Sequence, residues 1–245
     1  MSQKAAKNNM NAENKPLPPG QFEFPSFDRF GLGLFAKRFP ENPDSIAFTI
    51  GGDVCQTIKV SKAFAALPRV EQMSDFHCVT TWSVLSVRWS GVRFSDFYQQ
   101  MVVPLAKPQD GATFVVFRGE DGFSVSMPLD DLMASDVLLA DSLEGHGLGI
   151  EHGAPLRLVA PAHYGYKNAK HISAIEFWCN QRNYRFPFPY PKLMDHPRGR
   201  VALEERARFL PLWLVRPLYR ALMPFARYKM RKSLERYRAK GGRGA

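Results

Sequence analysis

The sequence predicts a mixed α+β domain over about residues 40–180. Strand-like segments outnumber helical ones, and the helical segments are short. Hairpins and brief excursions connect the strands, without the regular alternation of strand and helix that a parallel sheet needs. Of the 245 residues, 45% are apolar and 23% are charged, which is typical of a chain that buries a core and excludes disorder of the whole chain.

The first elements follow from local sequence signals. Residues Ile46–Gly52 are mostly apolar and end in a Gly-Gly pair, which predicts a strand followed by a turn. Ser61 as N-cap and Pro68 as stop predict a short helix between them. Residues 69–80 alternate apolar and polar side chains, which predicts a strand that runs into a loop at Cys78.

The sequence in the middle of the domain predicts a helix followed by a hairpin. We expect a turn at Gly91, followed by a helix with Ser95 as its N-cap. Residues 112–117 form an apolar run typical of a buried strand. Residues 118–122 (RGEDG) supply turn residues, and residues 123–128 return as the hairpin partner.

The last part of the domain contains a short helix and two strands. Residues 129–136 predict the helix, and residues 153–161 and 171–178 predict the strands. A loop at residues 162–170 separates these two strands. Neither GxGxxG nor GxxxxGK[ST] occurs, which argues against a dinucleotide-binding or P-loop fold.

The net charge of +10 is concentrated at the C-terminal end of the chain. From Arg198 onward 14 Lys and Arg stand against three Asp and Glu, whereas residues 1–197 carry 19 basic and 20 acidic side chains. The body of the protein is thus nearly neutral. We predict a flexible N-terminal arm at residues 1–20, a folded domain at 21–197 and a basic tail at 198–245.

The tail has the composition of an amphipathic segment. Pro211, Pro217 and Pro224 predict that it is divided into short helical pieces. Apolar residues recur at helical spacing beside arginines, namely Leu210, Leu214, Leu218, Ala221 and Phe225. Residues 205–240 therefore fit an anionic membrane surface or a membrane subunit, while packing on the domain itself stays an open alternative. Nucleic acid is disfavoured because no recognition motif accompanies the charge.

Cysteine content and the N-terminus indicate the compartment. Cys55, Cys78 and Cys179 form neither a disulfide framework nor a CxxC pair. The N-terminus shows no apolar export signal. We expect a cytoplasmic protein, with peripheral membrane association through the tail as the open alternative.

Three segments could carry chemistry, namely residues 75–92, 117–124 and 152–170. A lone cysteine such as Cys78 is more often a small buried apolar residue, but as a thiolate it binds soft metals. The neighbouring His77 could move protons near neutral pH. Arg157, Lys167 and Lys170 lie in or near a loop with Gly and Asn, where cations and backbone N–H groups can bind an anionic ligand. Solvated charges are the simpler interpretation of these three residues.

Two blocks of sequence carry a resemblance to a known family. The first is HCVTTWS at residues 77–83 with WSGV at 89–92, and the second is HGAPLRLVAP at 152–161 with YGYKNAK at 164–170. Together they resemble the molybdopterin-binding domain of the sulfite oxidase family. The resemblance is to its small bacterial branch, which includes the methionine-sulfoxide reductase catalytic subunit. It covers about residues 46–178 and implies the mixed fold of that family.

The resemblance also implies a role for individual residues. Cys78 matches the cysteine whose thiolate binds molybdenum, and Arg157 matches an arginine that contacts the pterin. Apart from the resemblance, we expect His77 as a second catalytic residue, because it is next to Cys78 in the sequence and can move protons near neutral pH. The implied cofactor-binding residues are Gly119, His152, Arg157, Lys167, Asn168, Ala169 and Lys170. No counterpart of further cofactor-binding residues is identified in residues 21–45.

The implied activity is two-electron oxygen-atom transfer on a small-molecule substrate, with molybdenum and molybdopterin as cofactors. No haem-binding domain is recognised, so we expect electrons to pass to or from a separate partner. The arginine set of true sulfite oxidases is not identified, which disfavours sulfite. The alternative is a non-enzymatic module of the same fold that binds a membrane or protein partner through its tail.

Overall fold

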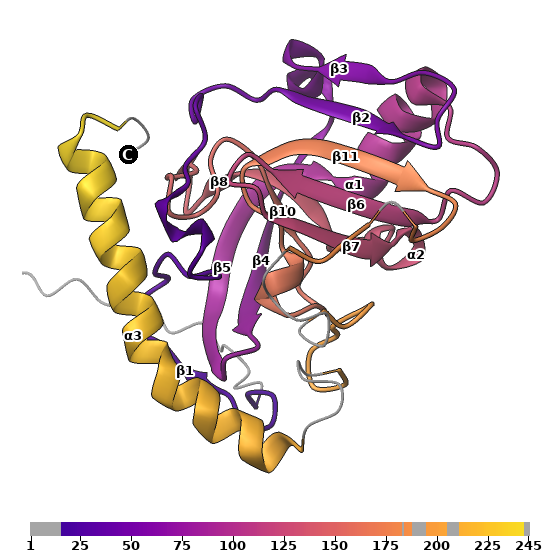
Figure 1. Cartoon of the computed structure of the whole chain (residues 1–245). Helices are drawn as coiled ribbons and strands as arrows, with labels where there is room; N and C mark the ends of the chain where they lie inside the picture. The colour runs from indigo at the N-terminus through magenta and orange to yellow at the C-terminus, as the bar shows by residue number, and fades with distance from the viewer. Residues whose placement is uncertain (1–15, 183, 188–194, 205–210, 243–245) are drawn as a thin grey trace, which may run out of the picture.

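The computed structural model describes residues 16–182, 184–187, 195–204 and 211–242. Within these ranges the chain forms two β-sheets, several short helices and one long C-terminal helix (Figure 1). The mixed α+β class that the sequence predicts is confirmed. Most of the predicted flexible arm at residues 1–20 lies outside the described residues, as do residues 205–210 of the tail.

One sheet is built around the long strand β5. It pairs antiparallel with β4 and β8, and parallel with the short strand β1. Strand β8 also pairs with β9 and β10. The strands of this sheet are β1 (Phe22–Glu23), β4 (Arg69–Cys78), β5 (Trp82–Arg93), β8 (Leu138–Leu143), β9 (His146–Gly147) and β10 (Arg157–Val159). The predicted strands at residues 69–80 and 153–161 therefore belong to one sheet.

The second sheet has the strand order β3-β2-β11-β6-β7. Strand β11 is parallel to β2 and antiparallel to β6, and β6 and β7 form the predicted hairpin. The strands are β2 (Phe48–Gly52), β3 (Ile58–Val60), β6 (Phe114–Gly119), β7 (Ser124–Pro128) and β11 (Ile172–Trp178). Each of these strands except β3 was predicted from the sequence.

The main core lies between the two sheets. Ile50, Val115 and Ile175 from the second sheet meet Val92 and Leu139 from the first, and all five side chains are fully buried. Each such burial stabilises the fold by about 1.5–3 kcal/mol. Short helices join the strands around this core, namely η1 (Phe35–Lys37), η2 (Lys62–Ala66), α1 (Phe94–Phe97), the π-helix η3 (Tyr98–Ala106), α2 (Leu129–Leu132) and η4 (Gly165–Lys167).

The predicted turn at Gly91 is wrong. Strand β5 continues through this residue, which lies at a register shift against β8. A Cβ atom at Gly91 would overlap the carbonyl oxygen of Leu139, so the glycine allows two strands to approach closely. The helix boundary differs as well, because α1 begins after Arg93 and Ser95 lies inside it instead of capping it.

The tail forms one helix, α3 (Leu212–Ala239), and not the predicted short pieces. Pro217 and Pro224 lie inside the helix, and each removes a backbone hydrogen bond at a cost of about 3 kcal/mol. Both prolines are exposed, whereas Val215 and Met230 are buried against the rest of the protein. Packing of this inner side therefore offsets the two interruptions.

Helix α3 runs along the outside of the molecule, past β1 and the lower ends of β4 and β5 (Figure 1). It contacts η1, and Ser233 Oγ donates a hydrogen bond of 2.5 Å to the carbonyl oxygen of Ala36. No helix in the described part of the chain is long and apolar enough to cross a lipid bilayer.

Candidate functional site

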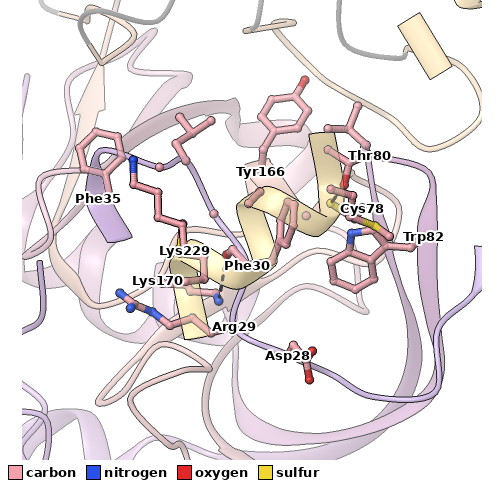
Figure 2. Close-up of a pocket in the computed structure, with 18 of the residues that line it drawn as sticks. Asp28, Arg29, Phe30, Phe35, Cys78, Thr80, Trp82, Tyr166, Lys170 and Lys229 are labelled. Carbon is pink, nitrogen blue, oxygen red and sulfur yellow. Dashed lines mark hydrogen bonds between the residues drawn. The ribbon is translucent and has the colours of Figure 1, made fainter. Parts of the chain in front are cut away.

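A cavity of about 440 Å³ lies beside Cys78 (Figure 2). Five parts of the chain that are distant in sequence line it: residues 27–35, the β4–β5 hairpin, the β6–β7 turn at 121–123, the loop at 165–171 and helix α3. Most of the lining side chains are aromatic or aliphatic. The charged ones are Asp28, Arg29, Asp121, Lys170 and Lys229.

Cys78 ends strand β4, and its side chain lines the cavity. A three-residue loop, Val79–Thr81, returns the chain to Trp82, the residue that pairs with Cys78 in β5. Thr81 has a φ of 75°, in the left-handed region that such a loop requires at its third position. The Thr80 hydroxyl lies 3.0 Å from the Cys78 sulfur, so the loop also provides a hydrogen-bonding group for that sulfur.

Segments outside the hairpin hold this loop in place. The Thr81 carbonyl accepts a hydrogen bond of 3.1 Å from the Phe22 amide of β1. The Thr81 hydroxyl accepts one of 3.4 Å from Arg220 of α3. Gln21 donates to the carbonyl of Cys78 at 3.1 Å. The N-terminal segment and the C-terminal helix therefore both position Cys78.

His77 faces away from the cavity. Side chains alternate along a strand, so Phe76 and Cys78 line the cavity while His77 points to the other side of β4. Its Nδ1 atom lies 2.7 Å from the Ser83 hydroxyl, and burial lowers its pKa. The structure does not bring the expected second catalytic residue together with Cys78.

Lys170 and Asn168 both line the cavity. Lys170 Nζ donates to the carbonyl oxygens of Glu151 at 2.9 Å and Phe30 at 3.5 Å. Burial, together with the charges of Arg157 and Arg29, holds the pKa of Lys170 well below its ordinary value. An anionic ligand would relieve this repulsion.

The other residues of this loop shape its backbone. The side chain of Asn168 accepts from the amide of Ala160 at 2.6 Å and donates to two carbonyl groups of the same loop. Ala169 is buried, and its carbonyl accepts from Leu158 at 2.8 Å. These contacts fix the loop that presents Lys170.

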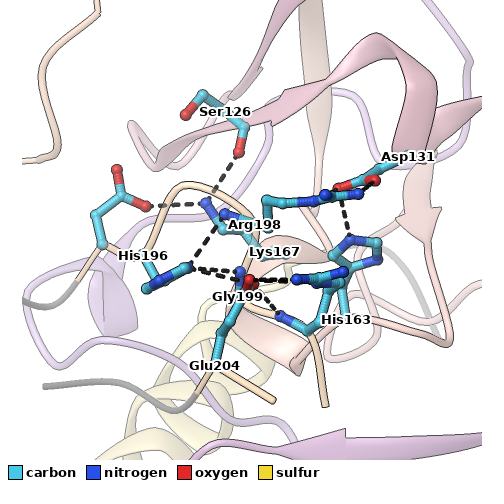
Figure 3. A network of polar contacts seen from close by, with 10 residues as sticks. Ser126, Asp131, His163, Lys167, His196, Arg198, Gly199 and Glu204 are labelled. Atoms are coloured by element: carbon cyan, nitrogen blue, oxygen red, sulfur yellow. Dashed lines mark hydrogen bonds and ion pairs between the residues drawn. The ribbon is translucent and has the colours of Figure 1, made fainter. Parts of the chain in front are cut away.

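Lys167 lies outside the cavity, in a separate polar network (Figure 3). Its fully buried ammonium donates to the carbonyl of Ser126 and to the carboxylate of Asp195, both at 3.0 Å. In the same network Asp131 pairs with Arg198 and His163. The predicted cofactor contact of Lys167 is therefore not supported by its position, and an ion pair accounts for its burial.

Arg157 and His152 lie behind the cavity wall. The Arg157 guanidinium is fully buried, donates to the carbonyl of His152 at 2.8 Å and lies 4.8 Å from the Trp89 ring. Among the described residues, its Nη2 atom and His152 Nδ1 have no hydrogen-bond partner. Burial lowers the pKa of Arg157 to about 9. Burial, with the charges of Lys170 and Arg157, lowers that of His152 to about 3.

Gly119 contributes through its lack of a side chain. A Cβ atom there would lie 2.6 Å from both the Asp121 carboxylate and the carbonyl oxygen of Lys170. The glycine therefore lets the end of β6 approach the loop that carries Lys170, and Gly119 itself does not line the cavity.

Two groups of lining residues were not predicted. Residues Phe27–Phe35 form one wall and include Arg29, which donates to the carbonyl of Ala36 at 2.8 Å and whose pKa burial lowers to about 10. Their sequence, FDRFGLGLF, combines aromatic residues, glycines and one arginine, and this was the available signal. Helix α3 forms another wall through Tyr219, Met223 and Met230, although sequence analysis separated the tail from the chemistry.

Comparison with known proteins identifies the domain that holds this cavity. Residues 36–185 match the model of the oxidoreductase molybdopterin binding domain. The uncharacterized oxidoreductase YuiH of Bacillus subtilis is 41% identical over 112 residues, which are 46% of this chain and 54% of that protein. The protein-methionine-sulfoxide reductase catalytic subunit MsrP of Campylobacter jejuni is 30% identical over 178 residues, 65% of this chain and 57% of that protein.

A solved structure supports the same fold. The sulfane dehydrogenase SoxCD from Paracoccus pantotrophus superimposes with a TM-score of 0.50 at 19% identity, over 59% of this chain and 40% of that one. The chain thus spans little more than half the length of the curated relatives above.

The cavity has donors that fit a molybdopterin cofactor. Cys78 offers the soft sulfur ligand that molybdenum accepts. Lys170 and Arg29 line the cavity and offer positive charge to a phosphate-bearing ligand. Behind the wall, the buried Arg157 adds positive charge, and its Nη2 atom has no hydrogen-bond partner among the described residues. The chain belongs to the oxidoreductase molybdopterin-binding domain family, whose cofactor is molybdopterin with molybdenum.

Proposed function

We propose that this chain is a molybdenum-dependent oxidoreductase in which the Cys78 thiolate ligates the metal. The observation that carries the proposal is the position of the Cys78 sulfur on the wall of a cavity that Lys170 and Asn168 also line. The bound cofactor would supply two-electron oxygen-atom transfer to or from a small-molecule substrate. The protein would supply ligation, orientation and electrostatics.

The residues around Cys78 suit these tasks. A hydrogen bond from the Thr80 hydroxyl, 3.0 Å from the sulfur, would stabilise the thiolate that metal binding requires. The Lys170 ammonium would bind an anionic group of the cofactor, and its neighbours Arg29 and Arg157 would add to the positive potential. The aromatic side chains of Phe27, Phe30 and Trp82 would keep bulk water from the cavity.

Electrons would be exchanged with a separate partner. The Campylobacter relative is a catalytic subunit, which supports an arrangement in which this domain holds the molybdenum centre and another protein accepts or donates electrons. The partner would approach the cavity from the side of α3 and residues 27–35, two of the segments that line it.

The test compares wild type, Cys78→Ser and a control with Cys55→Ser and Cys179→Ser, all made in a host that produces molybdopterin. Both control cysteines are exposed. Molybdenum and pterin per chain are measured, followed by viologen-coupled turnover of sulfoxides, N-oxides and sulfite. We expect turnover in wild type and control, and its loss in Cys78→Ser. A wild type without molybdenum and pterin, or an active Cys78→Ser variant, would overturn the proposal. A molybdenum-loaded wild type that turns over none of these substrates would favour the non-enzymatic alternative.

A further inference from the structure

Helix α3 has two apolar faces, and the domain covers one of them. Val215, Tyr219, Met223, Ala226 and Met230 recur at steps of three or four residues, and this face lies against the domain and the cavity. The second face carries large apolar side chains that are between 47% and 75% exposed, and two of them, Leu222 and Phe225, also line the edge of the cavity. Its members are Trp213, Leu214, Leu218, Leu222, Phe225 and Tyr228.

The second face is the main exposed apolar surface of the described chain. It holds six of the eleven large apolar side chains that the described residues leave exposed, with Trp213 75% and Phe225 67% accessible. Isolated exposed apolar residues are ordinary, but a continuous stripe along one helix marks an interaction surface.

The inner contacts prevent α3 from turning this stripe toward the domain. Arg227 forms an ion pair with Asp28, and Ser233 donates to the carbonyl of Ala36. The Tyr237 ring stacks on Phe39 with 4.0 Å between the ring centres. These contacts all lie on the inner side, so covering the outer stripe requires something other than the domain.

The charge of α3 indicates what that occupant is. The helix carries eight Lys and Arg and one acidic residue, Glu235. Beyond Tyr228, the same outer face continues one and two turns later with Lys232 and Arg236, both exposed. An apolar stripe that ends in cations, with Trp213 and Tyr228 at its two ends, is the pattern of a helix lying in an anionic lipid interface.

We propose that the outer face of α3 binds an anionic lipid surface, with the apolar stripe among the acyl chains and Lys232 and Arg236 at the phosphate groups. The inner face of the same helix lines the cofactor cavity, so the bilayer would lie on the cavity side of the domain. The proposal does not depend on the proposed redox activity. A lipid surface also suits a stripe that extends from Trp213 to Tyr228 and continues into cations better than the localised acidic patch of a protein partner does.

The test is flotation of the full-length, cofactor-loaded protein with vesicles of phosphatidylcholine and phosphatidylglycerol, compared with phosphatidylcholine alone. We expect binding to the anionic vesicles, weakened by salt. Replacing Trp213, Leu214 and Leu218 together by serine should weaken binding about ten-fold or more, since the inserted apolar area is lost. These three residues do not line the cavity. The matched control replaces three exposed apolar residues elsewhere, Met73, Val103 and Leu105, and should bind normally.

A second variant tests the charge independently of the apolar stripe. Lys232→Glu with Arg236→Glu should weaken binding at least about 25-fold, because each basic residue near an anionic surface is worth about five-fold in affinity and each new carboxylate is repelled as well. Lys59→Glu with Lys62→Glu, on exposed residues of β3 and η2, is the control and should change nothing.

Three results would overturn the proposal. The first is a wild type that does not float with anionic vesicles, and the second is a serine variant that floats as well as wild type. The third is a wild type that forms dimers in sedimentation, loses them in the serine variant and does not bind lipid. That outcome would assign the stripe to a second copy of the chain.

Discussion

Replacing Arg157 with methionine separates the charge of this side chain from its volume. The guanidinium is fully buried behind Phe27 and Phe76, and no carboxylate pairs with it among the described residues. Its Nη2 atom has no hydrogen-bond acceptor there. If this charge attracts an anionic group of the cofactor, it should destabilise the cofactor-free protein and stabilise the cofactor-loaded protein.

The magnitude follows from the pKa of Arg157, which burial lowers from 12.5 to about 9. Because the folded pKa is the lower one, the penalty is fully present below about pH 9 and disappears as pH rises to the unfolded value. At pH 7 it amounts to roughly 5 kcal/mol. The hydrogen bond to the carbonyl of His152 offsets about 2 kcal/mol. The contact with Trp89 offsets about 2 kcal/mol more.

We therefore expect Arg157→Met to stabilise the cofactor-free protein by about 1 kcal/mol, a rise in melting temperature of about 2–4 °C. The same variant should hold molybdopterin at least about 30-fold more weakly, since a buried charge partner is lost. Arg157→Lys keeps the charge but loses the planar guanidinium group. Its melting temperature and its affinity for molybdopterin should therefore lie between those of wild type and Arg157→Met.

The assay is thermal melting of cofactor-free protein, with pterin retention after dialysis measured on loaded protein. A cofactor-free Arg157→Met variant that melts several degrees below wild type would show that the guanidinium is structural. Pterin retention equal to wild type would refute the assignment of its charge to the cofactor.

Three further predictions concern the fold around the site. Lys167→Met should destabilise the protein by about 3–5 kcal/mol in urea unfolding, because it leaves the buried carboxylate of Asp195 without its cation. Burial and neighbouring cations lower the pKa of His152 to about 3, so its stabilising contribution is lost as pH falls below about 6.5. The free energy of unfolding of wild type should fall by about 2 kcal/mol between pH 7 and pH 5 because of this residue. In His152→Phe, the fall over the same pH range should be smaller by that amount. Gly91→Ala should cost more than about 3 kcal/mol in thermal unfolding, because its Cβ would overlap the carbonyl of Leu139 across β5 and β8.

Each of these predictions has a contrary outcome. A Lys167→Met chain as stable as wild type would show that the ion pair is dispensable. An unchanged pH dependence in His152→Phe would mean that His152 does not stay neutral on burial. A Gly91→Ala variant as stable as wild type would mean that β5 and β8 can move apart locally without a loss of stability.

The strands that carry the site could be predicted because their local signals agree with the fold. Alternation predicted β4 up to Cys78, and the apolar runs predicted β6 and β11. Gly91 was misread because glycine marks both turns and close strand contacts, and only the partner strand distinguishes them. The prolines of α3 were misread because local propensity does not include the packing of the inner face.

The site residues that belong to one sequence motif could be predicted. The residues that reach the cavity through contacts between distant segments could not. Cys78, Asn168 and Lys170 reach the cavity as the sequence motifs suggested. Strand alternation turns His77 away, and Asp195 draws Lys167 into an ion pair 28 residues away along the chain. The walls from residues 27–35 and α3 depend on contacts between the two ends of the chain, such as the pair of Asp28 with Arg227.

The most direct test of the central claim is molybdenum X-ray absorption on loaded wild type and Cys78→Ser, which counts the sulfur atoms bound to the metal. If the Cys78 thiolate is a ligand, the variant should show one sulfur fewer than wild type, while the control with Cys55→Ser and Cys179→Ser should match wild type. Identical sulfur coordination in wild type and Cys78→Ser would contradict the assignment of Cys78 as the metal ligand.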